Sequence, residues 1–296
     1  MHYIVLDFEW NQPLSEKEMI TEPFPFDSEI IEIGAVKLDE SFHSVDEFKT
    51  FIRPQFYPHM SGAIVQLTKI RPQELEKAPS LPEAFDSFID WCGDDCALCS
   101  WGPDDIPVLL DNMLLHGIPT EPFPYCYDLQ RIFAREILRE NRQCSLTDAV
   151  KILNLPADRA HDALNDTRNT VRVCERMDLA GCIDEYRTAF VGYESDRKSR
   201  LVSGQIYPSL DVALADTRVN EITCPYCGEQ VALTFSPQEE NTLLGYGICR
   251  EGDEFLAHLQ HYRQAGDARK VKRIVYEMSD DLWDTYQQAK SAASHG

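Results

Sequence analysis

Apolar residues gather in short runs near the start of the chain, and these runs predict strands. The segment YIVLDFEW at residues 3–10 is rich in β-branched and aromatic residues, as in a buried strand. Residues 29–38 (EIIEIGAVKL) and 48–52 (FKTFI) have the same character, and Pro54 ends the third run. Three strands in succession predict an antiparallel start to a mixed sheet.

Helical spacing follows the third strand. Residues 81–91 carry apolar side chains at intervals of three and four, which predicts an amphipathic helix. Short apolar runs at 97–101 and 125–129 predict two further strands, and the longest helical pattern covers residues 158–177. Strands that then alternate with helices predict one α/β domain over residues 1–185, a sheet with helices packed on it.

The pattern changes beyond this domain. Residues 186–220 are less periodic and are interpreted as a linker. Residues 221–296 form a second region, in which short strand-like pieces precede a helical spacing of apolar side chains at 255–262. A final helix is expected over residues 268–289.

Composition limits the class of protein. The 296 residues are 43% hydrophobic and 26% charged, which is ordinary for a globular protein. No apolar run reaches the length of a membrane span, and the N-terminus lacks the features of a secretion signal. We therefore expect no membrane association, a cytoplasmic location, and ten cysteines that are reduced thiols or metal ligands.

Charge is unevenly distributed along the chain. The formal net charge is −22, and residues 1–185 hold 16 Lys and Arg against 34 Asp and Glu. A charge of this sign excludes a broad electrostatic attraction to nucleic acid or to anionic membranes.

Two carboxylates interrupt the first apolar run. Asp7 and Glu9 are two residues apart, so on a strand they point to the same face, with Cα atoms roughly 6–7 Å apart. Like charges on a buried face repel each other and lose hydration, and a divalent cation between them would offset both effects. Oxygen ligands of this kind suit Mg²⁺ or Mn²⁺, although two solvated acids at an exposed strand end are the alternative.

Two more polar clusters lie at helix starts. Asp104 and Asp105 follow the strand at 97–101, where open α/β sheets place their sites, although capping of the next helix is the alternative. His161 and Asp166 stand at the start of the long helix, where the helix dipole favours a neutral imidazole that can act as a base. A surface histidine in a polar first turn is the simpler interpretation of His161 alone.

The order of these clusters resembles the DEDDh family of 3′→5′ exonucleases. The family pattern is Asp-x-Glu on a first strand, Trp-Gly-x-x-Asp after a middle strand and His-x-x-x-x-Asp late in the domain. Four other segments resemble the branch that trims histone mRNA 3′ ends and small RNAs: EIIEIGAV (29–36), FIRP (51–54), LTKI (67–70) and SWG (100–102). The resemblance covers about residues 1–178, and Lys69 stands where this branch usually has glycine.

The resemblance implies a fold and an activity. The fold would be RNase H-like, a mixed five-stranded sheet flanked by helices. The activity would be 3′→5′ hydrolysis of single-stranded RNA or DNA ends, with RNA favoured, releasing nucleoside 5′-monophosphates by a two-metal-ion mechanism. Rival hypotheses are a DNA repair or proofreading exonuclease, and a catalytically weak nucleic-acid-binding or adaptor protein that acts through the second region.

The resemblance also implies roles for single residues. His161 would be the general base, and Trp10 would stack on the terminal base, although a core tryptophan is an equal alternative. Asp105 fits the family's spacing from Trp101 better than Asp104 does. The ligands of two Mg²⁺ or Mn²⁺ ions would be Asp7, Glu9, Asp105 and Asp166.

The second region carries a separate metal motif. Cys224-x-x-Cys227-Gly228 predicts a structural, zinc-ribbon-like Zn²⁺ site, because glycine lets the backbone turn tightly around the metal. Cys249 is the expected third ligand and His258 the fourth, with His261 competing for that position. A set of two cysteines and two histidines, or a pair of ordinary thiols, are the alternatives.

Overall fold

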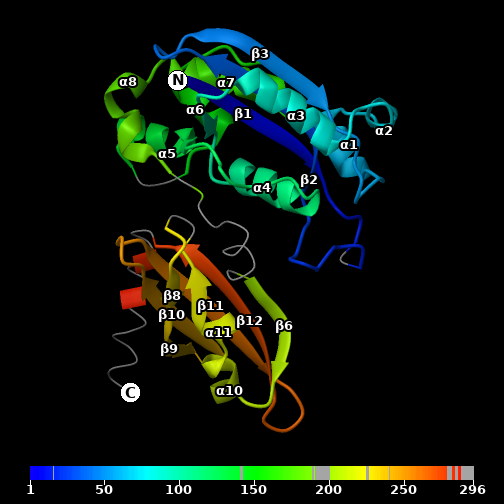
Figure 1. The fold of residues 1–296 in the computed structure, drawn as a ribbon. Helices are drawn as coiled ribbons and strands as arrows, with labels where there is room; N and C mark the ends of the chain where they lie inside the picture. The colour runs from blue at the N-terminus through cyan, green and yellow to red at the C-terminus, as the bar shows by residue number, and fades with distance from the viewer. Residues whose placement is uncertain are drawn as a thin grey trace. The chain divides into compact units, whose positions relative to one another are not determined.

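The chain divides into two compact units, Met1–Ala189 and Phe190–Gly296, and each has its own β-sheet (Figure 1). The residues described by this computed structural model are 1–15, 17–140, 143–188, 190, 201–224, 227–239, 241–278, 282–283 and 286–287.

A mixed five-stranded sheet organises the first unit, in the order β3-β2-β1-β4-β5. The central strand β1 (His2–Asn11) is antiparallel to β2 (Glu29–Leu38) and parallel to β4 (Cys96–Ser100). β3 (Ser44–Phe51) pairs antiparallel with β2, and β5 (Cys126–Asp128) pairs parallel with β4. The expected fold class, a mixed five-stranded sheet flanked by helices, is confirmed.

Helices surround this sheet (Figure 1). The longest pattern of the sequence becomes α7 (Ala163–Cys174), which lies against β1 and β2. The other helices are α1 (Gly62–Thr68), α2 (Pro72–Leu75), α3 (Leu81–Cys92), α4 (Asp105–Leu115), α5 (Leu129–Phe133), α6 (Leu146–Ile152) and α8 (Leu179–Cys182). A π-helical segment (Ala134–Leu138) follows α5, and a 3₁₀ turn (Ile183–Tyr186) follows α8.

One face of the sheet carries both the core and the acidic residues. Tyr3 and Val5 of β1 pack in one apolar cluster with Val171 of α7. Because side chains alternate along a strand, Asp7 and Glu9 continue the same face toward the carboxyl end of β1. The packing of α7 on β1 therefore determines which side chains face the two acids.

The second unit is mostly antiparallel sheet, with five strands in the order β6-β12-β11-β10-β9 and a separate β7–β8 pair. The strands are β6 (Leu201–Tyr207), β7 (Glu221–Thr223), β8 (Gln230–Ala232), β9 (Thr234–Glu239), β10 (Thr242–Ile248), β11 (Glu254–Arg263) and β12 (Arg269–Glu277). Two short helices, α10 (Leu210–Ala215) and α11 (Thr217–Asn220), connect β6 to β7.

Three predictions for this region are wrong. The linker placed over residues 186–220 contains β6, α10 and α11. The helix expected at 255–262 is β11, and residues 269–277 of the final helix form β12, with helical structure only at 282–283 and 286–287 among the described residues. Phe255 and Leu259, four apart, fit a helix and a strand equally well, and pairing of β11 with strands on both sides decides for the strand.

Candidate active site

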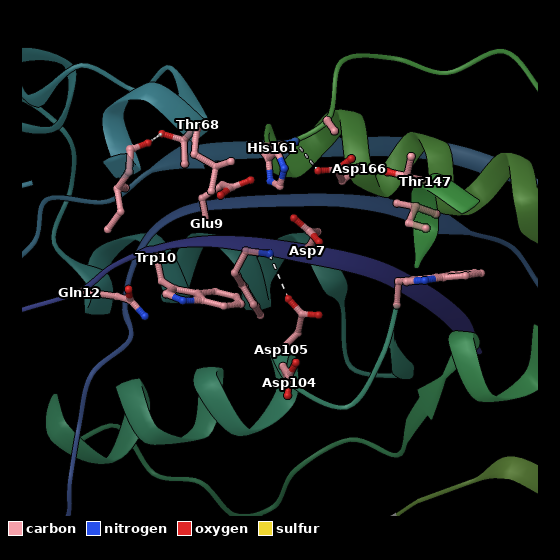
Figure 2. Close-up of a pocket in the computed structure, with 16 residues that line it drawn as sticks. Asp7, Glu9, Trp10, Gln12, Thr68, Asp104, Asp105, Thr147, His161 and Asp166 are labelled. Carbon is pink, nitrogen blue, oxygen red and sulfur yellow. Dashed lines mark hydrogen bonds between the residues drawn. The ribbon is translucent and has the colours of Figure 1, made fainter. Parts of the chain in front are cut away.

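Asp7 and Glu9 lie side by side on the central strand (Figure 2). Asp7 stands opposite Gly34 of β2, and Glu9 stands opposite Glu32. Glu9 is only 9% exposed. The two β1 carboxylates thus lie largely out of water and on the same face of the sheet, as the strand alternation predicts.

Asp105 is the first residue of α4 and joins the β1 acids from below in Figure 2. Its side chain is 6% exposed, and its Oδ1 accepts a hydrogen bond of 3.3 Å from the backbone N–H of Phe8. Asp104, by contrast, is exposed and precedes the helix as its N-cap. Burial and the bond to β1 favour Asp105 over its neighbour, and the choice stays a prediction.

The entry of α7 brings a histidine and the fourth acid above Glu9. His161 has a left-handed backbone (φ 63°), and its N–H donates a 2.7 Å hydrogen bond to Oδ2 of Asp166. Asp162 caps α7 by accepting a 3.2 Å hydrogen bond from the backbone N–H of Asn165. Side-chain ligand atoms of Glu9, His161 and Asp166 all lie within 4.8 Å of one another.

The close approach of α7 to the sheet depends on Gly34. A Cβ atom at this position would lie 2.2 Å from Ala163 C and from Leu164 N, both in the first turn of α7. The Thr167 hydroxyl donates a 3.1 Å hydrogen bond to the carbonyl of Gly34. Sequence reasoning missed this role, although Gly34 is the one residue without a side chain in its strand.

Burial and mutual repulsion perturb the acids of this site. The acid cluster is defined as Asp7, Glu9, Asp105 and Asp166. Burial raises the pKa of every member: strongly for Asp7, to about 8 for Glu9, to about 7 for Asp105, and also for Asp166. Neighbouring carboxylates add to this rise, so the cluster favours either protons or cations.

A different acid on the same face has its own cation. The Lys49 ammonium lies 2.6 Å from Glu32 Oε1 and 2.8 Å from Asp162 Oδ2. The other Glu32 oxygen accepts a 3.3 Å hydrogen bond from the backbone N–H of Ala163. Within the described part of the chain, no member of the acid cluster forms a salt bridge.

A cavity of about 460 Å³ opens above the acid cluster. Trp10 lines it and is half-buried. The remaining wall comes from α1, the β4–α4 connection and α6, and it includes Thr68 and Thr147 (Figure 2). A cavity of this volume can hold a nucleotide, and Trp10 and Trp101, both half-buried, are aromatic residues of its lining.

The second unit contains a group of sulfur and oxygen ligands, here named the thiol cluster: Cys224, Cys227, Cys249 and Asp253. One ligand atom from each lies within 4.8 Å of the others. His258 and His261, the predicted partners, do not belong to this group. Both lie in β11, where each residue advances about 3.4 Å, so His258 is roughly 14 Å beyond the strand's start at Glu254.

None of the ten cysteines forms a disulfide, and all ten are among the described residues. Within the same residues, no helix is long and apolar enough to cross a membrane.

Comparison with known proteins places these observations in a family. The profile of the Exonuclease family, RNase T type, matches residues 4–174. Human 3′-5′ exoribonuclease 1 is 25% identical over 171 residues, which cover 54% of this chain and 49% of that protein. The PolC-type DNA polymerase III of Thermotoga maritima is 32% identical over 176 residues, or 59% of this chain and 12% of that protein. The chain spans about half or less of the length of these relatives.

A solved structure is also similar. It is the nuclease domain of 3′hExo, a DEDDh family member bound to rAMP, with a TM-score of 0.53 and 25% identity. The match covers 61% of this chain and 93% of that one.

Proposed function

This chain belongs to the Exonuclease family of the RNase T type, and on that premise we propose that its first unit shortens single-stranded RNA one nucleotide at a time from the 3′ end. Residues 4–174 form a 3′→5′ exonuclease domain. The observation that carries the proposal is the acid cluster, gathered with His161 at the floor of one cavity.

The donor atoms of the cluster fit divalent cations. Four carboxylates with raised pKa values, and with no salt bridge to any residue that the structure describes, are an oxygen-rich set of the kind that binds Mg²⁺ or Mn²⁺. Asp7, Glu9, Asp105 and Asp166 would hold two such ions. When bound, the ions supply a water of lowered pKa and neutralise the charge that develops on the scissile phosphate.

The chain's own residues then divide the remaining tasks. His161, fixed by its backbone hydrogen bond to Asp166, takes a proton from the attacking water. Trp10 stacks on the 3′-terminal base. The products are a nucleoside 5′-monophosphate and a strand one nucleotide shorter.

RNA is the proposed substrate because the similar 3′-5′ exoribonuclease 1 is named for it and the 3′hExo nuclease domain holds rAMP. DNA is the second candidate, and the 32% identity to a PolC-type DNA polymerase supports it. RNA and DNA would bind in the same site, so the 2′-hydroxyl of the ribose is the feature that distinguishes the two substrates.

The test uses 5′-labelled single-stranded RNA and DNA of one sequence, incubated with Mg²⁺, with Mn²⁺, or without a divalent ion. The proposal expects an RNA ladder that shortens from the 3′ end only with metal, and none from Asp7→Asn. Faster shortening of DNA would transfer the proposal to the second candidate. Binding without shortening of either strand would leave the nucleic-acid-binding hypothesis standing instead.

A further inference from the structure

Two turns of the second unit bring the members of the thiol cluster together. Cys224 directly follows β7, and Cys227 lies in the turn that leads to β8. Cys249 directly follows β10, and Asp253 directly precedes β11. Cys224 and Cys249 are buried, at 0% and 5% exposed, so these two thiols point into the unit rather than into solvent.

The two turns are built alike. In the first, the Cys224 N–H donates to the Glu229 carbonyl at 2.8 Å, and Gly228 has a left-handed φ of 72°. In the second, the Cys249 N–H donates to the Asp253 carbonyl at 2.9 Å, and Gly252 has a φ of 98°. In both turns a cysteine N–H thus bonds forward to the residue that follows a left-handed glycine, a feature of turns that wrap a metal.

Contacts between the turns fix them face to face. Asp253 Oδ2 lies 3.3 Å from Cys224 Sγ and 3.0 Å from Cys249 Sγ. The Arg250 backbone N–H of the second turn donates a 2.7 Å hydrogen bond to the Glu229 carboxylate of the first. These contacts hold the thiols and the carboxylate close together.

The spacing matches a tetrahedral zinc site. Zn–S bonds of about 2.3 Å and Zn–O bonds of about 2.0 Å place sulfurs about 3.8 Å apart and sulfur about 3.5 Å from oxygen. The observed separations, none above 4.8 Å, are of this size. We propose that the thiol cluster binds one Zn²⁺ in a closed, four-ligand site, with Asp253 as the ligand in place of His258.

The site would fasten the β7–β8 pair to the main sheet. The apolar cluster at this junction is small: it joins Ile222 and Val231 of the pair to Phe255 and Val275 of the main sheet. Small cores of this kind gain folding free energy from a bound metal. Three thiolates select zinc over Mg²⁺ and Mn²⁺, so the proposed ion does not compete with those of the acid cluster.

The test measures metal content and a cobalt spectrum on the full chain, purified without chelator. Wild type is expected to hold one zinc per chain, and Cys224→Ser to lose it. Asp253→Asn should weaken zinc retention more than about 100-fold, beyond the roughly 10–100-fold expected for loss of an outer partner, whereas His258→Ala should leave it unchanged. Cys182→Ser, which removes a half-buried thiol of the first unit, is the matched control and should also leave it unchanged.

Cobalt distinguishes loss of a ligand from loss of folding. Each thiolate adds sulfur-to-cobalt charge-transfer absorption, so Co²⁺-loaded Asp253→Cys should absorb about four-thirds as strongly as the wild type. Zinc loss in His258→Ala with normal retention in Asp253→Asn would overturn the assignment of Asp253. A chain that neither contains zinc nor takes up Co²⁺ after reduction, or that shows a 2 Da mass loss from a disulfide, would overturn the site.

Discussion

The acid cluster and the thiol cluster differ in the atoms that they offer to a metal and in how open they are. The acid cluster uses oxygen atoms from β1, α4 and α7, and it opens into a cavity of about 460 Å³. The thiol cluster uses three sulfurs and one oxygen from two adjacent turns, and two of its thiols are buried. An open set of hard ligands suits chemistry, whereas a closed set of soft ligands suits stability.

The two clusters also have opposite relations to folding. The acid cluster is built from buried carboxylates that repel each other, so without metal it opposes the fold that holds it. The thiol cluster adjoins a small apolar core that would gain folding free energy from a bound metal. Variants in one cluster should therefore leave the metal of the other unchanged, and each cluster is an internal control for its counterpart.

The largest effect is expected from Asp7→Asn. Asp7 is the acid most strongly surrounded by other members of its cluster, so its loss should lower turnover at least about 10³-fold. The same change removes a buried like charge, so the melting temperature in Mg²⁺-free buffer should stay equal or rise. Turnover assays, melting curves and zinc analysis measure the three quantities. Near wild-type turnover would contradict the role of the acid cluster, and zinc loss would contradict the independence of the two clusters.

His161→Ala should lower turnover on the order of 10²–10⁴-fold, as expected for loss of a general base. Mn²⁺ binding measured by calorimetry should persist, because the acids rather than the imidazole are the proposed ligands. Lost Mn²⁺ binding would instead make His161 a ligand, an outcome that its proximity to Glu9 and Asp166 makes worth testing.

Gly34→Ala should destabilise the first unit by about 1–3 kcal/mol or more, because the added methyl group meets backbone atoms of α7 rather than a flexible side chain. Turnover should fall as well, since α7 carries Asp166. Gly62→Ala is the matched control, because a Cβ there meets nothing within 4 Å. Equal melting temperatures for the two variants would show that α7 does not depend on the missing side chain.

The pH dependence of stability should distinguish the acid cluster from ordinary surface acids. The pKa of Glu9 is about 8 in the folded chain against 4.5 ordinarily, so the folded state holds the extra proton between these values. Its contribution to stability is present below pH 4.5 and is lost as the pH rises toward 8. Dialysis without chelator removes Mg²⁺ and leaves tightly held zinc, and the first unit should then melt at lower temperature at pH 8 than at pH 5.

Saturating Mn²⁺ should reverse this trend, because metal binding strengthens as the carboxylates lose their protons. Glu9→Gln should flatten the metal-free slope. A metal-free melting temperature that rises over the same range would contradict the raised pKa values.

The fold of the first unit could be predicted from its sequence because its strands and helices differ in periodicity. Its candidate acids could be predicted because they lie on the first strand or in the first turn of a helix. Asp7 and Glu9 follow from alternation on one strand, and Asp166 and His161 from the start of one helix. Gly34 was missed because its importance comes from the close packing of α7 against it. No local sequence pattern encodes such a contact between distant segments. The helix predicted at 255–262 was wrong for a related reason. The apolar spacing there fits both a helix and a strand, and pairing with β10 and β12 decides for the strand.

The smallest effect is expected at Lys69, the position where the resemblance to the DEDDh exonucleases leads us to expect glycine. The structure gives a physical meaning to that departure, because Lys69 ends α1 with a left-handed backbone, at φ 67° and ψ 6°. A side chain in this conformation costs about 1–2 kcal/mol, and glycine avoids that cost while losing about 0.5–1 kcal/mol to its freer unfolded state. Lys69→Gly should therefore stabilise the first unit by up to about 1 kcal/mol, which is roughly 2–4 °C for a unit of this size.

Lys77→Gly, at an exposed turn whose φ is negative, is the control and should be neutral or destabilising. Thr68, the neighbour of Lys69, lines the cavity of the acid cluster, so turnover should be compared as well and should change less than about twofold if the turn only supports the wall. A loss of turnover without a gain in stability would mean that the lysine side chain contacts the substrate beside the acid cluster.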